Sequence, residues 1–291
     1  MKTHSHWQLN HNDLQLINLA LQEDLGLPYH DITTSLLFAD QQDFSSAKII
    51  SKNPDPIIMC GLPIIKKILQ SFNDNVECYS DYQEGDTINP GETLFTFKAP
   101  AQTLLMLERT LLNFLQHVCA VATQTAKFVQ CVNHTQTHIL DTRKTLPGFR
   151  HLDKYAVQCG GGVNHRMGLY DAIMIKDTHI DCLGGMTFAL DRLPDNILQT
   201  YPVIVEVRNK QELVIVLQQG LTKVTRVLLD NMTPDRLSEC VTMCENTMQT
   251  EASGNIRLDN VLNYAETGVN YISIGKLTHS PDHVDLSMVS L

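Results

Sequence analysis

The chain has 291 residues, and its 32 acidic side chains against 22 basic ones give a formal net charge of −10 at pH 7. A hydrophobic content of 43% is typical of a globular protein, and the length fits one large domain or two. The acidic balance argues against a nucleic-acid partner, no apolar run reaches the roughly 18 residues of a membrane span, and the N-terminus does not resemble a secretory signal.

The first hundred residues indicate an α+β domain. Residues 13–26 have the pattern of an amphipathic helix, and Gly26 is a natural residue to end it. Short β-rich runs follow at 45–51, 56–60, 75–82 and 93–99, and the turn-rich segment QEGDTINPGE separates the last two. Strands joined by turns, with a helix alongside, predict an open-faced α+β sandwich. A long helix is expected from about residue 101 to residue 132.

Strand and helix patterns alternate in the rest of the chain. Six β-rich runs occur at 138–141, 172–176, 203–207, 226–230, 248–252 and 271–275. Three helical patterns lie between them: one stops at Gly220, one starts at Thr233 as N-cap with Pro234 next, and one runs from Asn255 to Gly268. Short apolar strands alternating with helices predict a parallel α/β sheet buried on both faces.

Polar residues mark the ends of these six runs. They are Asp141 with Arg143 and Lys144, then Lys176, Glu206, Asp230, Glu251 with Ser253, and Gly275. In an α/β barrel the C-terminal ends of the strands form the active site, so we expect these side chains around one mouth. A carboxylate that ends an apolar strand is costly unless it meets a cation. For Glu206 and Asp230, that partner is either a metal ion or ligand bound at this mouth, or Lys176 or Lys144 in an internal salt bridge.

The eight cysteines are expected to be reduced, buried thiols of a cytoplasmic protein, because most lie in apolar stretches and the chain has no C-x-x-C pair. Cys240 and Cys244 can share a helix face, but without a paired His or Cys they do not indicate zinc.

One segment, Asp141 to Lys176, reverses the sign of the chain's charge. It contains six basic and three acidic residues, a net charge of +3 in a protein of net charge −10. Arg143, Lys144, His165 and Arg166 stand beside small or turn-forming residues, which let a ligand approach. A cationic cluster of this kind favours a small, highly charged anion over a solvated basic surface.

The same segment, DTRKTLPGFR followed by KYAVQCGGGVNHRMGLYDAIMIKDTHI, closely resembles the quinolinate phosphoribosyltransferases, the carboxylating nicotinate-nucleotide pyrophosphorylases of NAD biosynthesis. Further matches are ERTLLNFLQH, VIVEV, VLLDNM, EASGNI and YISIGKLTHS, in family order between residues 108 and 280. The resemblance implies an atypical, incomplete α/β barrel (113–277) with one more strand than the six above. It also implies an N-terminal domain (1–112) to which the tail 278–291 returns.

The resemblance also assigns roles to residues. It implies a quinolinate pocket of Arg143, His165, Arg166 and Lys176, completed by Arg109 from the partner of a homodimer. The alternative for Arg109 is an ion pair with Glu108 or another neighbour on the helix surface. The second substrate, phosphoribosyl pyrophosphate, is expected to bind with Mg²⁺ through Glu206 and Asp230, and through Thr142, Lys144, Ser253, Gly254, Asn255, Ile274, Gly275 and Lys276. The SGN turn would present backbone N–H groups at the start of a helix near Ile256 to the 5′-phosphate.

The expected reaction transfers phosphoribose to quinolinate and releases pyrophosphate and CO₂, with Lys144, Lys176, Glu206 and Asp230 as catalytic residues and no organic cofactor. Three alternatives stay open: a pyridine-carboxylate transferase that does not decarboxylate, a barrel lyase with Lys176 as Schiff base, and an inactive ligand-binding protein. Thr178, Arg208 and Lys276 depart from the family pattern, which leaves the expected reaction unaltered.

Overall fold

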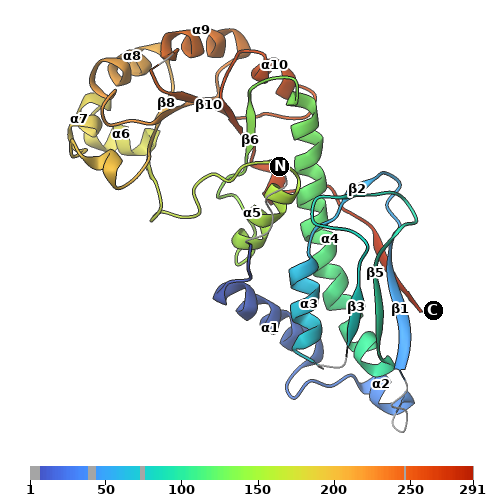
Figure 1. The fold of residues 1–291 in the computed structure, drawn as a ribbon. Helices are drawn as coiled ribbons and strands as arrows, with labels where there is room; N and C mark the ends of the chain where they lie inside the picture. Colours follow the sequence, from blue (N-terminus) through green and yellow to red (C-terminus); the bar gives the residue numbers. More distant parts are fainter. Residues whose placement is uncertain (1–6, 39–43, 73–75, 246, 291) are drawn as a thin grey trace. The chain divides into compact units, whose positions relative to one another are not determined.

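The computed structural model describes residues 7–38, 44–72, 76–245 and 247–290 (Figure 1). The chain divides into two compact units. The first comprises Met1–Ala126, Thr145–Gly161 and Leu277–Leu291, and the second comprises Lys127–Lys144 and Gly162–Lys276. The domain boundaries placed after residues 112 and 277 from the sequence stay predictions. Residues 150–159 fall inside the range predicted for the barrel and belong to the first unit.

The first unit is built on a four-stranded antiparallel sheet of order β12-β1-β5-β3 and a two-stranded pair, β2 and β4. Its strands are β1 (Phe44–Ser51), β2 (Ile57–Ile58), β3 (Glu77–Tyr79), β4 (Thr87–Ile88), β5 (Thr93–Pro100) and β12 (Leu286–Ser290). Its helices are α1 (His11–Leu25), α2 (Ile32–Leu37), α3 (Leu62–Gln70), α5 (Arg150–Cys159), most of α4 (Ala101–Val132) and most of α11 (Lys276–His279).

Local chemistry explains why several of these elements lie where the sequence predicts them. Helix α1 starts after Asn10, whose side chain accepts from the Asp13 N–H in a capping box, and it ends at Gly26 as expected. The long helix α4 has the predicted bounds. The C-terminal tail returns to this unit as expected, because β12 pairs antiparallel with β1.

The second unit contains one parallel sheet of order β6-β11-β10-β9-β8-β7. All six predicted strands are confirmed: β6 (His138–Leu140), β7 (Ile173–Ile175), β8 (Val203–Val207), β9 (Arg226–Asp230), β10 (Gln249–Ser253) and β11 (Tyr271–Ser273). The connecting elements are α6 (Asp177–Leu183), α7 (Met186–Asp191), η1 (Ile197–Gln199), α8 (Lys210–Gln219), α9 (Pro234–Cys244) and α10 (Val261–Ala265). Helices α7 to α10 lie along the outer side of the curved sheet (Figure 1).

The extra strand implied by the family resemblance is reduced to a single residue. Val163 forms an isolated parallel bridge with Leu140 of β6. The segment before it, Gly160 to Gly162, has no side chains to pack on a sheet, and glycine weakens strand formation. Among the described residues, the barrel is therefore an open six-stranded sheet with one added bridge.

Two of the three predicted helices of this unit have the expected ends, and the third is shorter. Helix α8 stops at Gly220, and α9 starts after Thr233 with Pro234 in its first turn. Helix α10 begins at Val261, so the prediction of a helix from near Ile256 is wrong. The Asn260 side chain accepts from the Arg257 N–H at 2.7 Å, which holds the preceding residues in turns.

Within the described residues, no helix combines the length and the hydrophobicity that crossing a membrane requires.

Candidate active site

The polar residues predicted around one mouth do lie at one edge of the second unit's sheet. Its six strands are parallel, so their C-terminal ends meet at the same edge. Five strand ends carry Lys144, Lys176, Glu206, Asp230 and Ser253, and the sixth leads to Ile274 and Gly275. The strands that lead to these ends consist largely of buried apolar residues, such as Val205, Val227 and Leu229. The apolar strands fix the backbone, and the polar residues follow where the apolar run stops.

Glu206 and Asp230 form the acidic side of this edge. Burial and the nearby charges of Asp230 and Asp177 raise the pKa of Glu206, and the positive charge of Lys176 only partly offsets them. Asp230 itself accepts hydrogen bonds from neutral groups, the Ser253 hydroxyl at 2.6 Å and the Asn231 amide at 2.6 Å. Two neighbouring carboxylates of which one is half-buried make a local excess of negative charge, which suits a bound cation.

The turn after β10 is shaped by one close approach. Ser253 and Asp230 are register partners in adjacent strands. Gly254 follows with a φ of +97°, and a Cβ atom there would lie 2.1 Å from the Asn231 side-chain oxygen. Asn231 and Asn255 both adopt left-handed conformations with a φ of 52°. Only glycine fits at residue 254, so the strand-end loops of β9 and β10 interlock around it.

The helix predicted to follow the SGN turn, and to bind a phosphate at its N-terminus, does not begin there. Because α10 starts at Val261 and has 5 residues, Ser253 to Asn255 do not form the N-terminus of a helix. Ile274, which is 2% exposed, donates its N–H to the Leu140 carbonyl, and Lys276 is an exposed residue at the start of the short helix α11. The backbone of these turns stays close to the strand ends, but the helix-dipole contribution expected for a phosphate is absent here.

The cationic side is formed by Arg143 and Arg166. Burial and the positive charge of Arg143 lower the pKa of Arg166, and Asp171 counteracts them only in part. Arg166 donates one guanidinium N–H to the Ala172 carbonyl at 3.0 Å. Lys144 is exposed, and its backbone N–H donates to the Thr142 hydroxyl at 3.0 Å. The two guanidinium groups are half-buried and repel each other. A bound anion with more than one negative charge would neutralise them.

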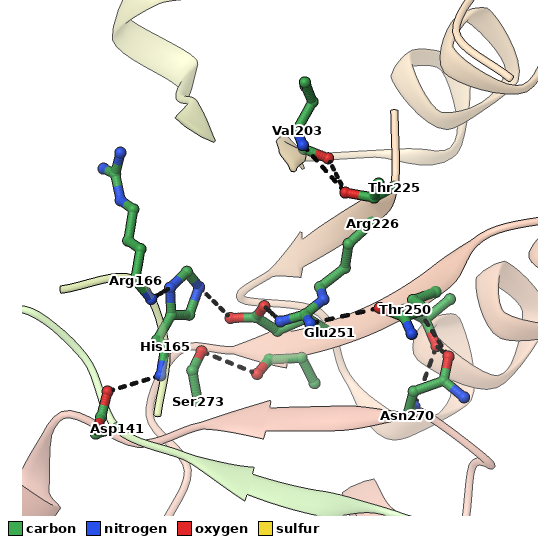
Figure 2. Close-up of polar contacts among 12 residues, drawn as sticks. Asp141, His165, Arg166, Val203, Thr225, Arg226, Thr250, Glu251, Asn270 and Ser273 are labelled. Atoms are coloured by element: carbon green, nitrogen blue, oxygen red, sulfur yellow. Dashed lines mark hydrogen bonds and ion pairs between the residues drawn. The ribbon is translucent and has the colours of Figure 1, made fainter. Parts of the chain in front are cut away.

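His165 is the centre of a buried polar network (Figure 2). Its backbone N–H donates to Asp141 at 2.9 Å, and its ring Nδ1 accepts from the Arg166 backbone N–H at 2.7 Å. The proton of the neutral ring is therefore on Nε2, which lies 3.3 Å from the Glu251 carboxylate. On its other oxygen, Glu251 pairs with Arg226 at 3.0 Å. The network holds the backbone on both sides of His165 and so sets where Arg166 leaves the loop.

Glu251 remains ionised in this network although it is 0% exposed. Burial on its own raises the pKa of this carboxyl, but the interactions with His165 and Arg226 outweigh burial and lower it. Arg226 also stacks on the Tyr271 ring, with 3.8 Å between the guanidinium carbon and the ring centroid. The sequence analysis placed Asp141 and Glu251 at the strand ends without a role in the site, and it did not include Arg226. The signal for them was a charged residue within an apolar strand, which requires a partner.

The charged segment 141–176 does not stay together in the structure. Arg143, Lys144, Arg166 and Lys176 belong to the second unit, whereas Arg150 and Lys154 lie on α5 in the first. Lys154 is 0% exposed. Arg109, also in the first unit, is exposed on α4. Arg208 is an exposed residue that pairs with Glu212 at 2.6 Å and with Asp181 at 3.0 Å.

Known proteins resemble this chain along almost its whole length. A sequence model of the quinolinate phosphoribosyl transferase C-terminal domain matches residues 121–289, and that of the N-terminal domain matches residues 31–119. The chain is 37% identical over 281 residues to a probable nicotinate-nucleotide pyrophosphorylase [carboxylating] of Bacillus subtilis (strain 168), covering 96% of this chain and 94% of that protein.

Two further relatives agree. A quinolinate phosphoribosyltransferase [decarboxylating] 1b of Nicotiana tabacum is 37% identical, with 94% of this chain and 81% of that protein covered. The solved structure of the nicotinate-nucleotide pyrophosphorylase from Francisella tularensis superposes with a TM-score of 0.89 at 33% identity, covering 98% of each chain.

Proposed function

This chain belongs to the quinolinate phosphoribosyl transferase family, and from that premise we infer how its own residues perform the reaction. The reaction transfers phosphoribose from phosphoribosyl pyrophosphate to quinolinate with decarboxylation, giving nicotinate mononucleotide, pyrophosphate and CO₂ in NAD biosynthesis. The enzyme is therefore a pentosyltransferase. The observation that carries the assignment to these residues is the sharing of one sheet edge by a cationic cluster and an acidic pair.

Quinolinate is the ligand that this cationic cluster suits. It is a planar ring with two adjacent carboxylates, and a planar guanidinium binds a carboxylate through two parallel hydrogen bonds. Burial and the positive charge of Arg143 lower the pKa of Arg166, and a dianion between the two guanidinium groups would offset their repulsion. His165 next to Arg166, and Lys176 near Glu206 at the same sheet edge, are the further positive or proton-bearing groups that we assign to quinolinate. A pyridine monocarboxylate would leave part of this positive charge unmatched.

The phosphoribosyl pyrophosphate is assigned to the loops after β6, β9, β10 and β11. We assign Lys144 to the pyrophosphate, because its exposed ammonium group can stay bound to this leaving group as it departs. The loops that carry Thr142, Ser253 to Asn255 and Ile274 to Lys276 surround the ribose 5′-phosphate. Since the turn at Gly254 precedes no long helix, the phosphate contacts must come from individual N–H groups and side chains.

Glu206 and Asp230 fit Mg²⁺, because burial and the negative charge of Asp230 raise the pKa of Glu206 and a hard cation prefers carboxylate oxygens. When bound, Mg²⁺ would supply charge neutralisation at the pyrophosphate. The two carboxylates also face the carbon that becomes positive as the bond from ribose C1 to the pyrophosphate oxygen lengthens. They stabilise this oxocarbenium character electrostatically.

The remaining steps are driven by the substrate. The pyridine nitrogen bonds to ribose C1 as pyrophosphate leaves, which makes the ring cationic. The bond to the carboxylate next to nitrogen then breaks, CO₂ departs, and its electron pair stays on the ring carbon until a proton arrives. We assign this proton delivery to Lys176, because both ring nitrogens of His165 are engaged with Arg166 and Glu251. No covalent intermediate with the protein is required.

A homodimer with shared sites is part of this proposal, and it rests on one exposed face of α4. Leu105, Arg109 and Asn113 are exposed at four-residue spacing on a helix whose other faces are largely buried, and Leu105 is 46% exposed. An apolar side chain beside an unburied arginine suits a partner subunit. We propose that this face delivers Arg109 to the partner's quinolinate pocket.

Mixing two defective variants tests the shared site. Arg109→Ala combined with Lys176→Ala should recover roughly a quarter of wild-type activity after random subunit exchange, since about half the dimers are mixed and each has one intact site. If the mixture is no more active than the separate variants, with subunit exchange verified by mass, Arg109 does not act across the dimer.

The decisive assay for the reaction supplies quinolinate, phosphoribosyl pyrophosphate and Mg²⁺, and measures CO₂ and nicotinate mononucleotide. Nicotinate in place of quinolinate is the control, and turnover at a comparable rate would establish the transferase that does not decarboxylate. Trapping with borohydride would reveal a Schiff base on Lys176, and we expect none.

As a further part of the proposal we place the protein in the cytoplasm, because all eight cysteines are unpaired thiols.

A further inference from the structure

Three donor side chains outside the strand-end site gather in the first unit. The thiols of Cys60 and Cys159 and a carboxylate oxygen of Glu84 all lie within 4.8 Å of one another. Cys60 directly precedes Gly61 and α3, Glu84 lies between β3 and β4, and Cys159 is the last residue of α5. Cys60 is 0% exposed and Cys159 is 5% exposed. Residues far apart in the sequence thus bring two buried sulfurs and the oxygen of a half-buried carboxylate together.

The backbone on both sides of this cluster is held in place by helix α4. A Cβ atom on Gly61, next to Cys60, would lie 2.9 Å from the Leu115 side chain. A Cβ atom on Gly160, next to Cys159, would lie 2.3 Å from the Ala122 carbonyl oxygen. At Gly160 the backbone contact excludes any side chain, and at Gly61 a φ of +118° together with the Leu115 contact favours glycine. The backbone at both cysteines therefore packs on the same helix, α4, and this packing brings the two thiols together.

The donors already share protons in this arrangement. The Cys159 thiol donates to Glu84 Oε2 at 3.7 Å, and Glu84 Oε1 accepts the Leu62 N–H at 2.7 Å. The N–H of Gly61 lies 3.1 Å from both carboxylate oxygens. The negative carboxylate therefore caps the N-terminus of α3. This helix end would partly compensate the negative charge that the thiols acquire when they lose their protons.

We propose that Cys60, Glu84 and Cys159 bind a thiophilic divalent cation, with Zn²⁺ as the natural occupant. Thiolate sulfur at about 2.3 Å and carboxylate oxygen at about 2.0–2.2 Å are its usual ligands, which puts donor atoms roughly 3.3–3.8 Å apart in a tetrahedral site. The observed spacing of at most 4.8 Å needs a contraction on the order of 1 Å. The cation takes the place of the two thiol protons, which pass to solvent.

A fourth ligand is available close by. The Tyr155 side chain interacts with the Glu84 carboxyl, and the Cys119 thiol donates to the Cys60 carbonyl at 3.3 Å. With its ligands on three segments, the ion would tie the end of α5 to the start of α3. In sequence, α5 lies between the segment with Arg143 and Lys144 and the segment with His165 and Arg166. The role that follows is a structural one, fixing this connection in the fold.

The experiment titrates the full-length reduced protein with Cd²⁺ and Zn²⁺ without oxygen. Cd²⁺ reports thiolate ligands through ultraviolet charge-transfer absorption, and Zn²⁺ affinity is measured against a chromogenic chelator. We expect one metal ion per chain and an affinity that weakens as pH falls, because protons compete for the ligands. Cys60→Ala and Cys159→Ala should each abolish the absorption and weaken Zn²⁺ binding by more than the roughly 100-fold of an outer-shell substitution. Cys182→Ala, which removes an exposed thiol, is the matched control and should bind as wild type does.

The proposal fails if wild-type protein shows no thiolate–metal absorption, or if either single variant keeps it. It also fails if alkylation and mass measurement of the protein as isolated, before any reductant is added, show Cys60 and Cys159 joined as a disulfide, because the same sulfurs cannot then bind the ion. Should the alanine variants not fold, X-ray absorption at the zinc edge of the wild-type protein decides. Two sulfur neighbours with oxygen support the site, and a shell of nitrogen and oxygen alone overturns it.

Discussion

Replacing Glu251 by Gln should remove a large part of the stability of the strand-end network while preserving its shape. The carboxylate is 0% exposed, lies 3.0 Å from Arg226 and 3.3 Å from His165, and has no solvent to replace either partner. Removing one partner of a buried ion pair costs about 3–5 kcal/mol. Arg226 remains stacked on Tyr271, and glutamine keeps one acceptor oxygen, so the free energy of unfolding should fall by about 3 kcal/mol, the lower end of that range. This corresponds to a fall in Tm on the order of 6–12 °C for a domain of this size.

The same substitution should change how stability depends on pH. The folded-state pKa of Glu251 is lowered below its ordinary value of 4.5. A lowered pKa means that the stabilisation is fully present above the unfolded-state pKa and is lost as pH falls through the folded-state pKa. The difference between wild type and Glu251→Gln should therefore be constant above pH 4.5 and shrink in more acidic solution.

Unfolding in guanidinium chloride at several pH values measures both effects, with the midpoint shifted and the slope unchanged. Glu239→Gln is the matched control, because Glu239 pairs with Lys210 at 3.3 Å but is 64% exposed, and such pairs contribute at most about 1 kcal/mol. Equal losses in the two variants, or a Glu251 effect that persists unchanged into acid, would refute the reasoning that a buried, ionised Glu251 stabilises the network.

Three further predictions concern catalysis. Arg166→Ala should weaken quinolinate binding by about 1.5–3 kcal/mol, tenfold or more, while binding of phosphoribosyl pyrophosphate measured by calorimetry stays nearly constant. Glu206→Gln should lower kcat by roughly 10²–10³-fold in steady-state assays. Because burial and then neighbouring carboxylates raise the pKa of Glu206, wild-type kcat should fall with decreasing pH at a higher pH than an ordinary glutamate would give. Gly254→Ala should raise the KM for phosphoribosyl pyrophosphate, because its Cβ would meet Asn231 at 2.1 Å, whereas Gly268→Ala, with its nearest atom at 3.8 Å, should leave that KM unchanged.

Sequence patterns were sufficient wherever a signal is local. The six strands of the parallel sheet and the ends of α1, α8 and α9 are as predicted, and the C-terminal tail returns to the first unit as the family resemblance implies. Apolar runs fix which residues are buried, and Gly, Pro and Thr fix where helices end, because each acts through its own backbone. The family followed from motifs in a fixed order. Since strand ends of a parallel sheet share an edge, the strand-end members of the site could also be predicted.

Only the tertiary structure decided which distant residues meet. Glu251 and Arg226 are 25 residues apart and pair because β9 and β10 are neighbours in register. Cys60 and Cys159 meet because two glycines let their segments approach α4, whereas Cys240 and Cys244 had drawn attention through spacing alone. The helix expected near Ile256 begins at Val261, because the Asn260 side chain competes for the Arg257 N–H. Local patterns fix the elements and their buried faces, but a charge or thiol inside the fold takes its chemistry from partners that only packing supplies.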